Sequence, residues 1–223
     1  MHKFLLVVAI AGGCSDPGSG ASGPPVPLSD FAVKFSSSTC GKAFECCTTA
    51  EITAQYGTQI TTEANCDTQI SGLLSGFQVP AYQASITAGR LEYDAAAAGN
   101  CLALIDSLSC ADYSNKMMMA SVPGCSDFLI PKVANGGACA QSYECTSDNC
   151  MGANSSPPTD GSCMPVPAIG QACEFKCASG AYCKGTTCAA AKADGETCND
   201  NTQCASDHCD TTCMPAVATC DGL

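Results

Sequence analysis

Cysteine is the residue that most constrains this chain, which contains 21 of them in 223 residues. Cytosolic proteins are kept reduced, whereas cysteine densities of this order are typical of secreted domains held by disulfides. With Cys14 set aside, the other 20 cysteines form an even set that can pair completely and leave no free thiol. We therefore expect a chain that is exported and folds in an oxidising compartment. The cysteines predicted to form disulfides are Cys40, Cys46, Cys47, Cys66, Cys101, Cys110, Cys125, Cys139, Cys145, Cys150, Cys163, Cys173, Cys177, Cys183, Cys188, Cys198, Cys204, Cys209, Cys213 and Cys220.

Residues 1–13 have the organisation of a signal peptide. A basic start at His2 and Lys3 is followed by an apolar run over residues 4–11 and by two glycines before Cys14. The run is shorter than the roughly 20 apolar residues that a membrane-spanning helix needs. Small residues directly before a cysteine resemble the lipobox of bacterial lipoproteins, which implies that Cys14 is acylated after the leader is removed. Ordinary secretion is the alternative.

The residue after the cysteine also carries information about destination. By resemblance to Gram-negative lipoproteins, Ser15 favours sorting to the outer membrane, on its periplasmic face or at the cell surface. Several acyl chains on one cysteine hold a protein durably on a bilayer without a transmembrane helix. Residues 14–30 are rich in Gly, Ser and Pro and are predicted to be a flexible tether.

Residues 31–135 are predicted to form a small helical domain stapled by disulfides, because their apolar residues recur with helical spacing. The clearest segments are residues 63–77 and residues 94–108, with Tyr93 extending the second by one turn. Residues 48–51 have the spacing of a capping box that starts a shorter helix. The predicted inward-facing residues are Cys66, Ile70, Leu73, Leu74 and Phe77 in the first segment and Ala97, Cys101, Leu104, Ile105 and Leu108 in the second.

Residues 136–223 are predicted to be a disulfide-rich, loop-dominated tail with little regular secondary structure. They contain very few Ile, Leu, Val or Phe side chains, so disulfides must replace a hydrophobic core. The tail is interpreted as three cysteine-rich repeats, at about 136–163, 170–188 and 195–213, each with four cysteines. Four cysteines allow three connectivities, of which we expect first-to-third with second-to-fourth.

The positions of three cysteines restrict which disulfide partners they can take. Cys46 and Cys47 are adjacent, and we expect them to take separate partners because a bond between neighbours is strained. Cys220 stands outside every repeat, and we expect it to reach back to the helical half.

The repeated Gly-x-x-Cys-x5-Cys-x4-Cys spacing, with small and polar residues between the cysteines, resembles the Dickkopf N-terminal cysteine-rich domain. It looks closest to the myxobacterial lipoproteins that carry this label, and the likeness covers Gly136 to Cys213. Phe44 to Cys47 and the run from Gly89 to Asp94 also look like the front part of those proteins. The resemblance implies a small extracellular disulfide module and carries over no receptor-binding residue.

We expect no catalytic residue, no cofactor and no metal site. His208 is the only histidine after the leader and lies in a short loop between cysteines, and triads, HExxH sites and phosphate-binding loops are missing. Asp194, Glu196, Asp207 and Asp210 are interpreted as solvated surface. With Asp200, the last two could bind Ca²⁺ weakly, but the ordered ligand ladder is missing. The C-x3-C spacing suits zinc, but the export signal and even count favour disulfides.

The formal charge of −12 makes nucleic acid a poor partner, since phosphate contacts need clusters of Lys and Arg. The predicted function is that of a non-catalytic exported lipoprotein of the bacterial envelope. Its partners would be the membrane, through acyl chains on Cys14, and another envelope or surface protein or polymer, or its role would be structural. The alternative is a disulfide-rich inhibitor or toxin-like module, in which a rigid loop such as Met151 to Ser162 engages an envelope or extracellular hydrolase.

Overall fold

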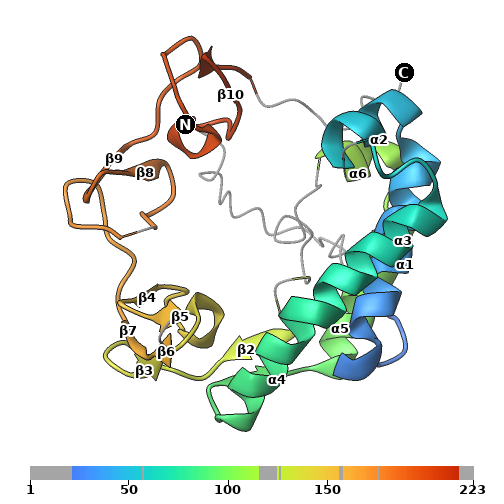
Figure 1. Cartoon of the computed structure of the whole chain (residues 1–223), viewed down its shortest axis with the longest axis horizontal. Coiled ribbons are helices and arrows are strands. Elements are labelled where there is room, and N and C mark those ends of the chain that lie inside the picture. Colours follow the sequence, from blue (N-terminus) through green and yellow to red (C-terminus); the bar gives the residue numbers. More distant parts are fainter. Residues whose placement is uncertain are drawn as a thin grey trace, which may run out of the picture. The chain divides into compact units, whose positions relative to one another are not determined.

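The computed structural model describes residues 22–56, 58–115, 125, 127–155, 158–174 and 176–215. The chain divides between Lys132 and Val133 into two units (Figure 1). We call residues 22–132 the helical unit and residues 133–215 the cysteine-rich unit. From the sequence, the division was expected a few residues later, between residues 135 and 136.

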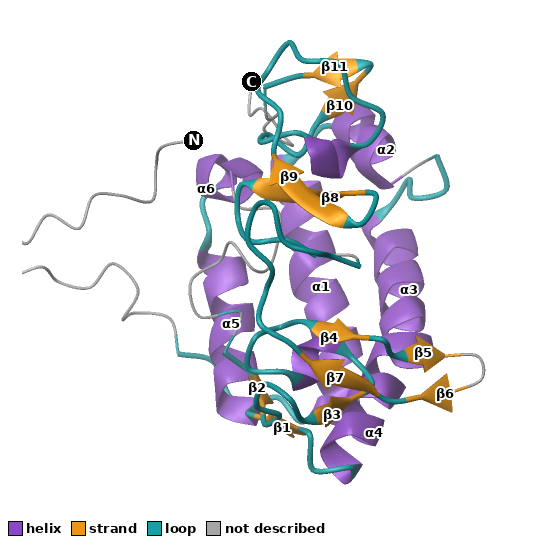
Figure 2. Cartoon of the chain, turned by 90° about the vertical axis from the view of Figure 1, so that its left-hand side faces the viewer, coloured by secondary structure: helices purple, strands orange, loops and turns teal. Residues whose placement is uncertain are grey.

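The helical unit consists of helices joined by short turns and a two-stranded antiparallel sheet. Its elements are α1 (Leu28–Cys46), α2 (Thr49–Tyr56), α3 (Glu63–Leu73), the π-helix η1 (Leu74–Gln78), α4 (Val79–Thr87), β1 (Leu91–Tyr93), α5 (Ala95–Ser107), α6 (Cys110–Asn115) and β2 (Leu129–Pro131). Helix α1 lies between α3 and α5 (Figures 1 and 2). In the sheet, Leu91 lies opposite Pro131.

The helix predicted over residues 94–108 is α5, but Tyr93, which was expected to extend it by one turn, lies instead in strand β1 opposite Leu129. The Asp94 carboxylate accepts hydrogen bonds from the backbone N–H groups of Ala96 and Ala97, at 2.8 and 3.0 Å, and caps α5. Before α2, the predicted capping box is present. The Thr48 N–H donates to Glu51 Oε2 at 2.6 Å, and the Glu51 N–H donates to Thr48 Oγ1 at 3.4 Å.

A π-helical turn separates α3 from α4. In this turn the backbone N–H of Val79 donates to the carbonyl of Leu74, five residues back. The next residue, Pro80, has no N–H, and its ring would clash with the carbonyl four residues back in a regular α-helix. A wider turn relieves this clash, so the proline accounts for the position of the π-helix.

The apolar face predicted over residues 63–77 is therefore only partly buried. Cys66 is fully buried, and Ile70 and Leu74 pack against the core. Leu73 and Phe77, in contrast, are 60% and 72% exposed, so the prediction that they face inward was wrong. Phe77 lies within the π-helical turn, where the 3.6-residue period on which the prediction rested no longer applies.

The helical unit has one main apolar core, formed where α1, α5 and the sheet meet. The Phe31 ring lies at its centre, 5.5 Å from Phe35, 6.1 Å from Tyr93 and 4.9 Å from Phe128 between ring centroids. From α5, Cys101 and Ile105 are buried as predicted, and Ala98 and Leu102 are buried beside them. Ala97, Leu104 and Leu108 are partly buried against this core.

Disulfides reinforce this core at several points. Cys101 bonds to Cys125, Cys40 to Cys66 and Cys46 to Cys110. Cys47 is also disulfide-bonded, to a residue other than its neighbour. The expectation that the two adjacent cysteines take separate partners is therefore confirmed.

The segment just before α1 is part of the helical unit and not of a tether. The Val26 N–H donates to the Ala95 carbonyl at 2.8 Å, and the Tyr93 hydroxyl donates to the Val26 carbonyl at 2.8 Å. Gly99 of α5 lies so close that a Cβ on it would be 2.0 Å from the Pro24 carbonyl oxygen. Of the predicted tether over residues 14–30, the described part from residue 22 onward is thus folded.

In the described part of the cysteine-rich unit, the regular elements are short strands and two 3₁₀ turns, connected by loops. Its elements are β3 (Ala138–Cys139), η3 (Ser142–Glu144), β4 (Cys150–Met151), β5 (Asn154–Ser155), β6 (Pro158–Thr159), β7 (Gly161–Cys163), β8 (Ala181–Lys184), β9 (Thr187–Ala190), η4 (Asn201–Gln203), β10 (Cys209–Asp210) and β11 (Thr212–Cys213). Strand β7 pairs with both β3 and β4, and the other strands form two-stranded antiparallel hairpins.

Six disulfides hold this unit, and they fall into three four-cysteine segments. We call residues 133–165 the first segment, residues 166–190 the middle segment and residues 191–215 the last segment. In each of them the first cysteine bonds to the third and the second to the fourth, which is the pairing expected from the sequence. The bonds are Cys139–Cys150, Cys145–Cys163, Cys173–Cys183, Cys177–Cys188, Cys198–Cys209 and Cys204–Cys213.

Candidate binding surface

The first and last segments follow the same plan. Near its start, each has a glycine in the left-handed region, Gly136 with φ 87° and Gly195 with φ 89°. The N–H of Gly136 donates to the Cys163 carbonyl, and that of Gly195 to the Cys213 carbonyl, both at 2.7 Å. These two hydrogen bonds therefore close each segment on its fourth cysteine in the same way.

The clearest shared feature is a tight turn just before the third cysteine. Asp148 and Asp207 occupy equivalent positions in it, with φ of 52° and 56°, a left-handed conformation that aspartate tolerates better than most residues. The Asp148 N–H donates to the Cys145 carbonyl at 2.8 Å, and the Asp207 N–H to the Cys204 carbonyl at 3.1 Å. We call residues 145–149 the first aspartate turn and residues 204–208 the last aspartate turn.

The first aspartate turn is occupied by a side chain of the middle segment. Lys176 Nζ donates to the backbone carbonyl of Asp148 at 3.1 Å and also forms an ion pair with Asp148 Oδ2. Beside it, the Gly152 N–H donates to the Glu174 carboxylate at 3.0 Å. The middle segment thus closes this turn with a cation that touches both acceptors of one aspartate.

The middle segment has a glycine in the corresponding turn, and the last segment supplies its donor. Gly180 has φ 78°, and its carbonyl accepts the N–H of Ala191 at 2.8 Å. Next to it, Lys192 Nζ lies 5.9 Å from the centroid of the Tyr182 ring and donates to the Gln203 side-chain oxygen at 2.8 Å. Each of these two turns therefore receives a donor from the segment that follows it.

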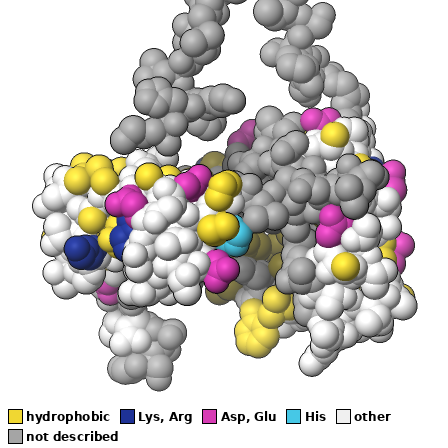
Figure 3. All heavy atoms as spheres, turned by 90° about the horizontal axis from the view of Figure 1, so that it is seen from above, with side chains coloured by type: hydrophobic (Ala, Val, Ile, Leu, Met, Phe, Trp, Pro, Cys, Tyr) yellow, Lys and Arg dark blue, Asp and Glu magenta, His cyan; other side chains and the backbone are white. Residues whose placement is uncertain are grey.

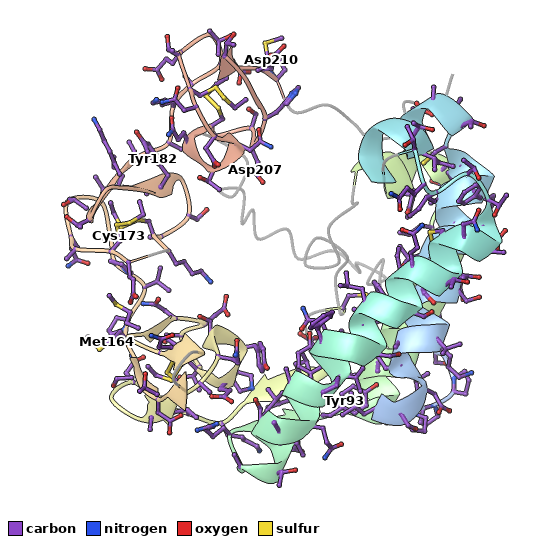
Figure 4. The ribbon with its side chains drawn as sticks, in the orientation of Figure 1. Tyr93, Met164, Cys173, Tyr182, Asp207 and Asp210 are labelled. Atoms are coloured by element: carbon purple, nitrogen blue, oxygen red, sulfur yellow. A yellow bond between two sulfur atoms is a disulfide. The ribbon has the colours of Figure 1, made fainter. Side chains whose placement is uncertain are left out.

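In the structure as far as it is described, no donor from another segment reaches the last aspartate turn. Among the described residues, the Asp207 carboxylate makes no hydrogen bond or ion pair, and its side chain is exposed. Figure 4 shows Asp207 and Asp210 at different points of the last segment. The carboxylates on the face seen in Figure 3 outnumber the Lys and Arg side chains, in keeping with the net charge of −12.

The first segment differs from the last by an inserted hairpin. Between Cys209 and Cys213 the last segment has a short turn, whereas the first has strands β5 and β6 between Cys150 and Cys163. Figure 2 shows this hairpin extending beyond β4 and β7. The loop from Met151 to Ser162, singled out in the sequence, therefore protrudes from the segment, and the cysteines on either side of it, Cys150 and Cys163, are both disulfide-bonded.

Three other groups singled out in the sequence, Asp200, Glu196 and His208, contact the backbone of loops in the last segment. Asp200 Oδ1 accepts the Thr202 hydroxyl at 2.6 Å and its N–H at 2.9 Å, and these bonds hold the pKa of Asp200 below its usual value. The Glu196 carboxylate accepts a backbone N–H three residues before it, at 2.5 Å. His208 Nδ1 lies 3.2 Å from the Pro215 carbonyl. These contacts stabilise loops and do not bring a base to a nucleophile.

Cysteine sulfurs gather within 4.8 Å of one another in each segment, as metal ligands also do. In every one of these groups the sulfurs belong to disulfides. A disulfide sulfur lacks the thiolate charge that binds zinc, so these clusters are accounted for by the cross-links.

Two of the predicted site residues, Cys14 and Cys220, lie outside the described residues. Over the part of the chain that the structure describes, none of the helices has both the length and the apolar character needed to cross a bilayer. No protein-family model, no curated protein and no solved structure matches this chain.

Sequence reasoning missed the contacts between segments. The repeated Ser-Asp-x-Cys at Ser147 and Ser206 was a visible signal for two equivalent turns. Nothing in the sequence, however, marked Lys176 or Glu174 as their partners, since these contacts join residues that are 22 and 28 positions apart.

Proposed function

We propose that this chain is a non-catalytic exported lipoprotein of the bacterial envelope. Cys14 carries the acyl chains that attach it to the outer membrane, and its cysteine-rich unit binds an envelope or surface protein or polymer, or serves as a structural spacer. The three segments are copies of one disulfide module, in line with the resemblance to the Dickkopf-like cysteine-rich lipoproteins. Secretion without an anchor is the alternative location.

The observation that carries this proposal is the oxidation state of the cysteines. All 19 cysteines among the described residues are disulfide-bonded. This supports folding outside the reducing cytosol. Loops fixed by short cross-links lose little entropy when they bind, which suits recognition more than catalysis. The Asp200 and Glu196 carboxylates accept backbone N–H groups of turns, and His208 Nδ1 lies beside the Pro215 carbonyl, which favours structural roles for these three side chains.

The test is the intact mass and the thiol count of protein purified from membranes. We expect acyl mass on Cys14 and no free thiol. Cys14→Ser should remove the acyl mass and release the protein from the membrane fraction, whereas Ser15→Ala, the matched control, should keep both. Bound zinc or many free thiols would overturn the disulfide scheme, and an unmodified Cys14 would leave the secreted alternative.

The inserted hairpin favours a second candidate, an inhibitor of an envelope or extracellular hydrolase. Such a module needs a protruding loop on a rigid base, and the segment between Cys150 and Cys163 has this form. Replacing residues 151–162 with the short turn of the last segment, residues 210–212, keeps both disulfides. If a screen of envelope proteases finds nanomolar inhibition that this replacement abolishes, the inhibitor candidate is supported, and a screen without inhibition removes it.

A further inference from the structure

We propose that the last aspartate turn, residues 204–208, binds the ammonium group of a lysine side chain on a partner protein. The inference rests on the proposed binding function and names the chemistry of the partner. The molecule already contains one turn of this kind, the first aspartate turn, to which Lys176 is bound.

The occupied copy is the first aspartate turn. There, Lys176 Nζ reaches the backbone carbonyl of Asp148 at 3.1 Å and its carboxylate together. The left-handed backbone lets one aspartate present both acceptors to a single ammonium group. Asp207 has the same conformation, the same preceding serine and the same N–H bond to the second cysteine of its segment. The acceptors that hold Lys176 are therefore repeated in the last segment.

In the part of the chain that the structure describes, the last turn is not filled in the way the other two are. The first turn receives Lys176 and the middle turn receives the Ala191 N–H, in each case from the following segment. After Lys192 the printed sequence contains no Lys or Arg. Among the described residues, no Lys or Arg side chain reaches the Asp207 carboxylate, so its acceptors are open to a cation from a partner.

The charge of the last segment favours a cationic partner. From residue 193 to residue 215 there are five carboxylates and no Lys or Arg. Their summed field draws positively charged groups toward the segment and is screened by salt. A single exposed ion pair contributes little to the free energy of binding. The turn would therefore fix the orientation of the partner and add specificity, within a wider contact with a basic protein surface. The carboxylates are Asp194, Glu196, Asp200, Asp207 and Asp210.

The experiment follows backbone amide shifts of the disulfide-bonded protein by NMR during titration with N-acetyl-lysine methylamide. In the natural sequence we expect shifts at residues 206–208 and none at residues 147–149, where Lys176 already occupies the turn. The uncharged analogue N-acetyl-norleucine methylamide should move neither set. High salt should weaken the response to the lysine probe.

Three variants sharpen the test. Asp207→Asn keeps a residue that tolerates the left-handed backbone, and it should weaken probe binding by about fivefold, the most that one exposed pair contributes. Asp210→Asn is the matched control, since it removes the same charge from the same segment, and it should leave the shifts at 206–208 in place. Lys176→Gln empties the first turn, so the probe should now shift residues 147–149 as well.

Two results would overturn the inference. One is the absence of any lysine-specific shift at residues 206–208. The other is an equal loss of response in Asp207→Asn and Asp210→Asn, which would mean general attraction to an acidic surface. Neither result bears on the acylation and thiol measurements, so this inference can fail while the proposed envelope function stands.

Discussion

The two units of this chain are stabilised in the folded state by different interactions. The helical unit buries aromatic and aliphatic side chains around Phe31 and adds disulfides to a core that is already present. In the cysteine-rich unit, the buried residues of the first and last segments are mostly the cysteines themselves. The first unit is therefore held by burial with cross-links as reinforcement, and the second by cross-links with backbone hydrogen bonds as reinforcement.

Because of this difference, the two units tolerate amino-acid substitutions at different positions. A short cross-linked loop gains stability because the unfolded chain is restricted, so the side chains between the cysteines are free to vary. A core gains stability from close packing, so its side chains are constrained while its surface is free. Variation for binding is thus easiest between the cysteines of segments 133–215.

The largest effect is expected from removing one disulfide of the first segment. Replacing both Cys145 and Cys163 with Ser should cost about 2–5 kcal/mol and unfold that segment, because no apolar core remains to hold it. Replacing Cys101 and Cys125 should lower the stability of the helical unit but leave it folded. Dispersed amide signals for residues 138–163 in the first variant would contradict the distinction between the two units.

Truncating the centre of the aromatic cluster should be the next largest effect. Phe31→Ala should destabilise the helical unit by about 3–5 kcal/mol, because it leaves a cavity among three other rings. Urea unfolding followed by helix circular dichroism measures this. Phe77→Ala is the control at a position that is 72% exposed, and it should change stability by less than about 0.5 kcal/mol. Equal effects of the two would mean that the core has been misplaced.

Two glycines of the helical unit should respond in opposite directions. In Gly99→Ala the new Cβ would clash with the Pro24 carbonyl, so residues 22–27 should detach at a cost of about 1–3 kcal/mol. At Gly72 in α3 a Cβ meets nothing within 4 Å, and Gly72→Ala should stabilise the helix by about 0.5–1 kcal/mol. Thermal unfolding of both variants compares them, and a neutral Gly99→Ala would show that the packed N-terminal segment contributes nothing.

The last prediction concerns the hydroxyl of Tyr93. Burial, followed by the charges of Asp30 and Asp94, raises its pKa from 10.0 to about 12. The unfolded state loses this proton first, so the stability of the helical unit should fall as the pH rises from 10 toward 12. Phenolate absorbance follows the titration. In Tyr93→Phe this part of the pH dependence should vanish, at a cost of about 1 kcal/mol for the lost bond to Val26.

The sequence predicted best where a single local rule applies. The capping box from Thr48 to Glu51 and the pairing within each four-cysteine segment both follow from spacing over a few residues. The different means by which the two halves are held follow from their content of apolar residues. Disulfide pairing was accessible because the four cysteines of a segment are close in sequence. The units themselves could thus be outlined from the sequence.

Features that depend on tertiary packing were not accessible in the same way. Helix α1 contains the polar run from Ser36 to Thr39, whose residues are weak helix formers. It forms because Phe31 and Phe35 are buried, while the buried Ser36 hydroxyl is satisfied by the Val33 carbonyl at 2.9 Å. The π-helical turn at Pro80 likewise lies within a pattern that predicts an uninterrupted helix.

The packed segment before α1 limits how far the helical unit can lie from a membrane anchor at Cys14. If the anchor is at Cys14, as proposed, only eight residue steps separate it from Ser22, the first residue that the structure describes. Fully extended, eight residues reach at most about 28 Å. The helical unit would then be confined to a shell next to the headgroups, on a connection about as long as a bilayer core is thick. The helical unit would therefore lie close to the membrane and not on a long stalk.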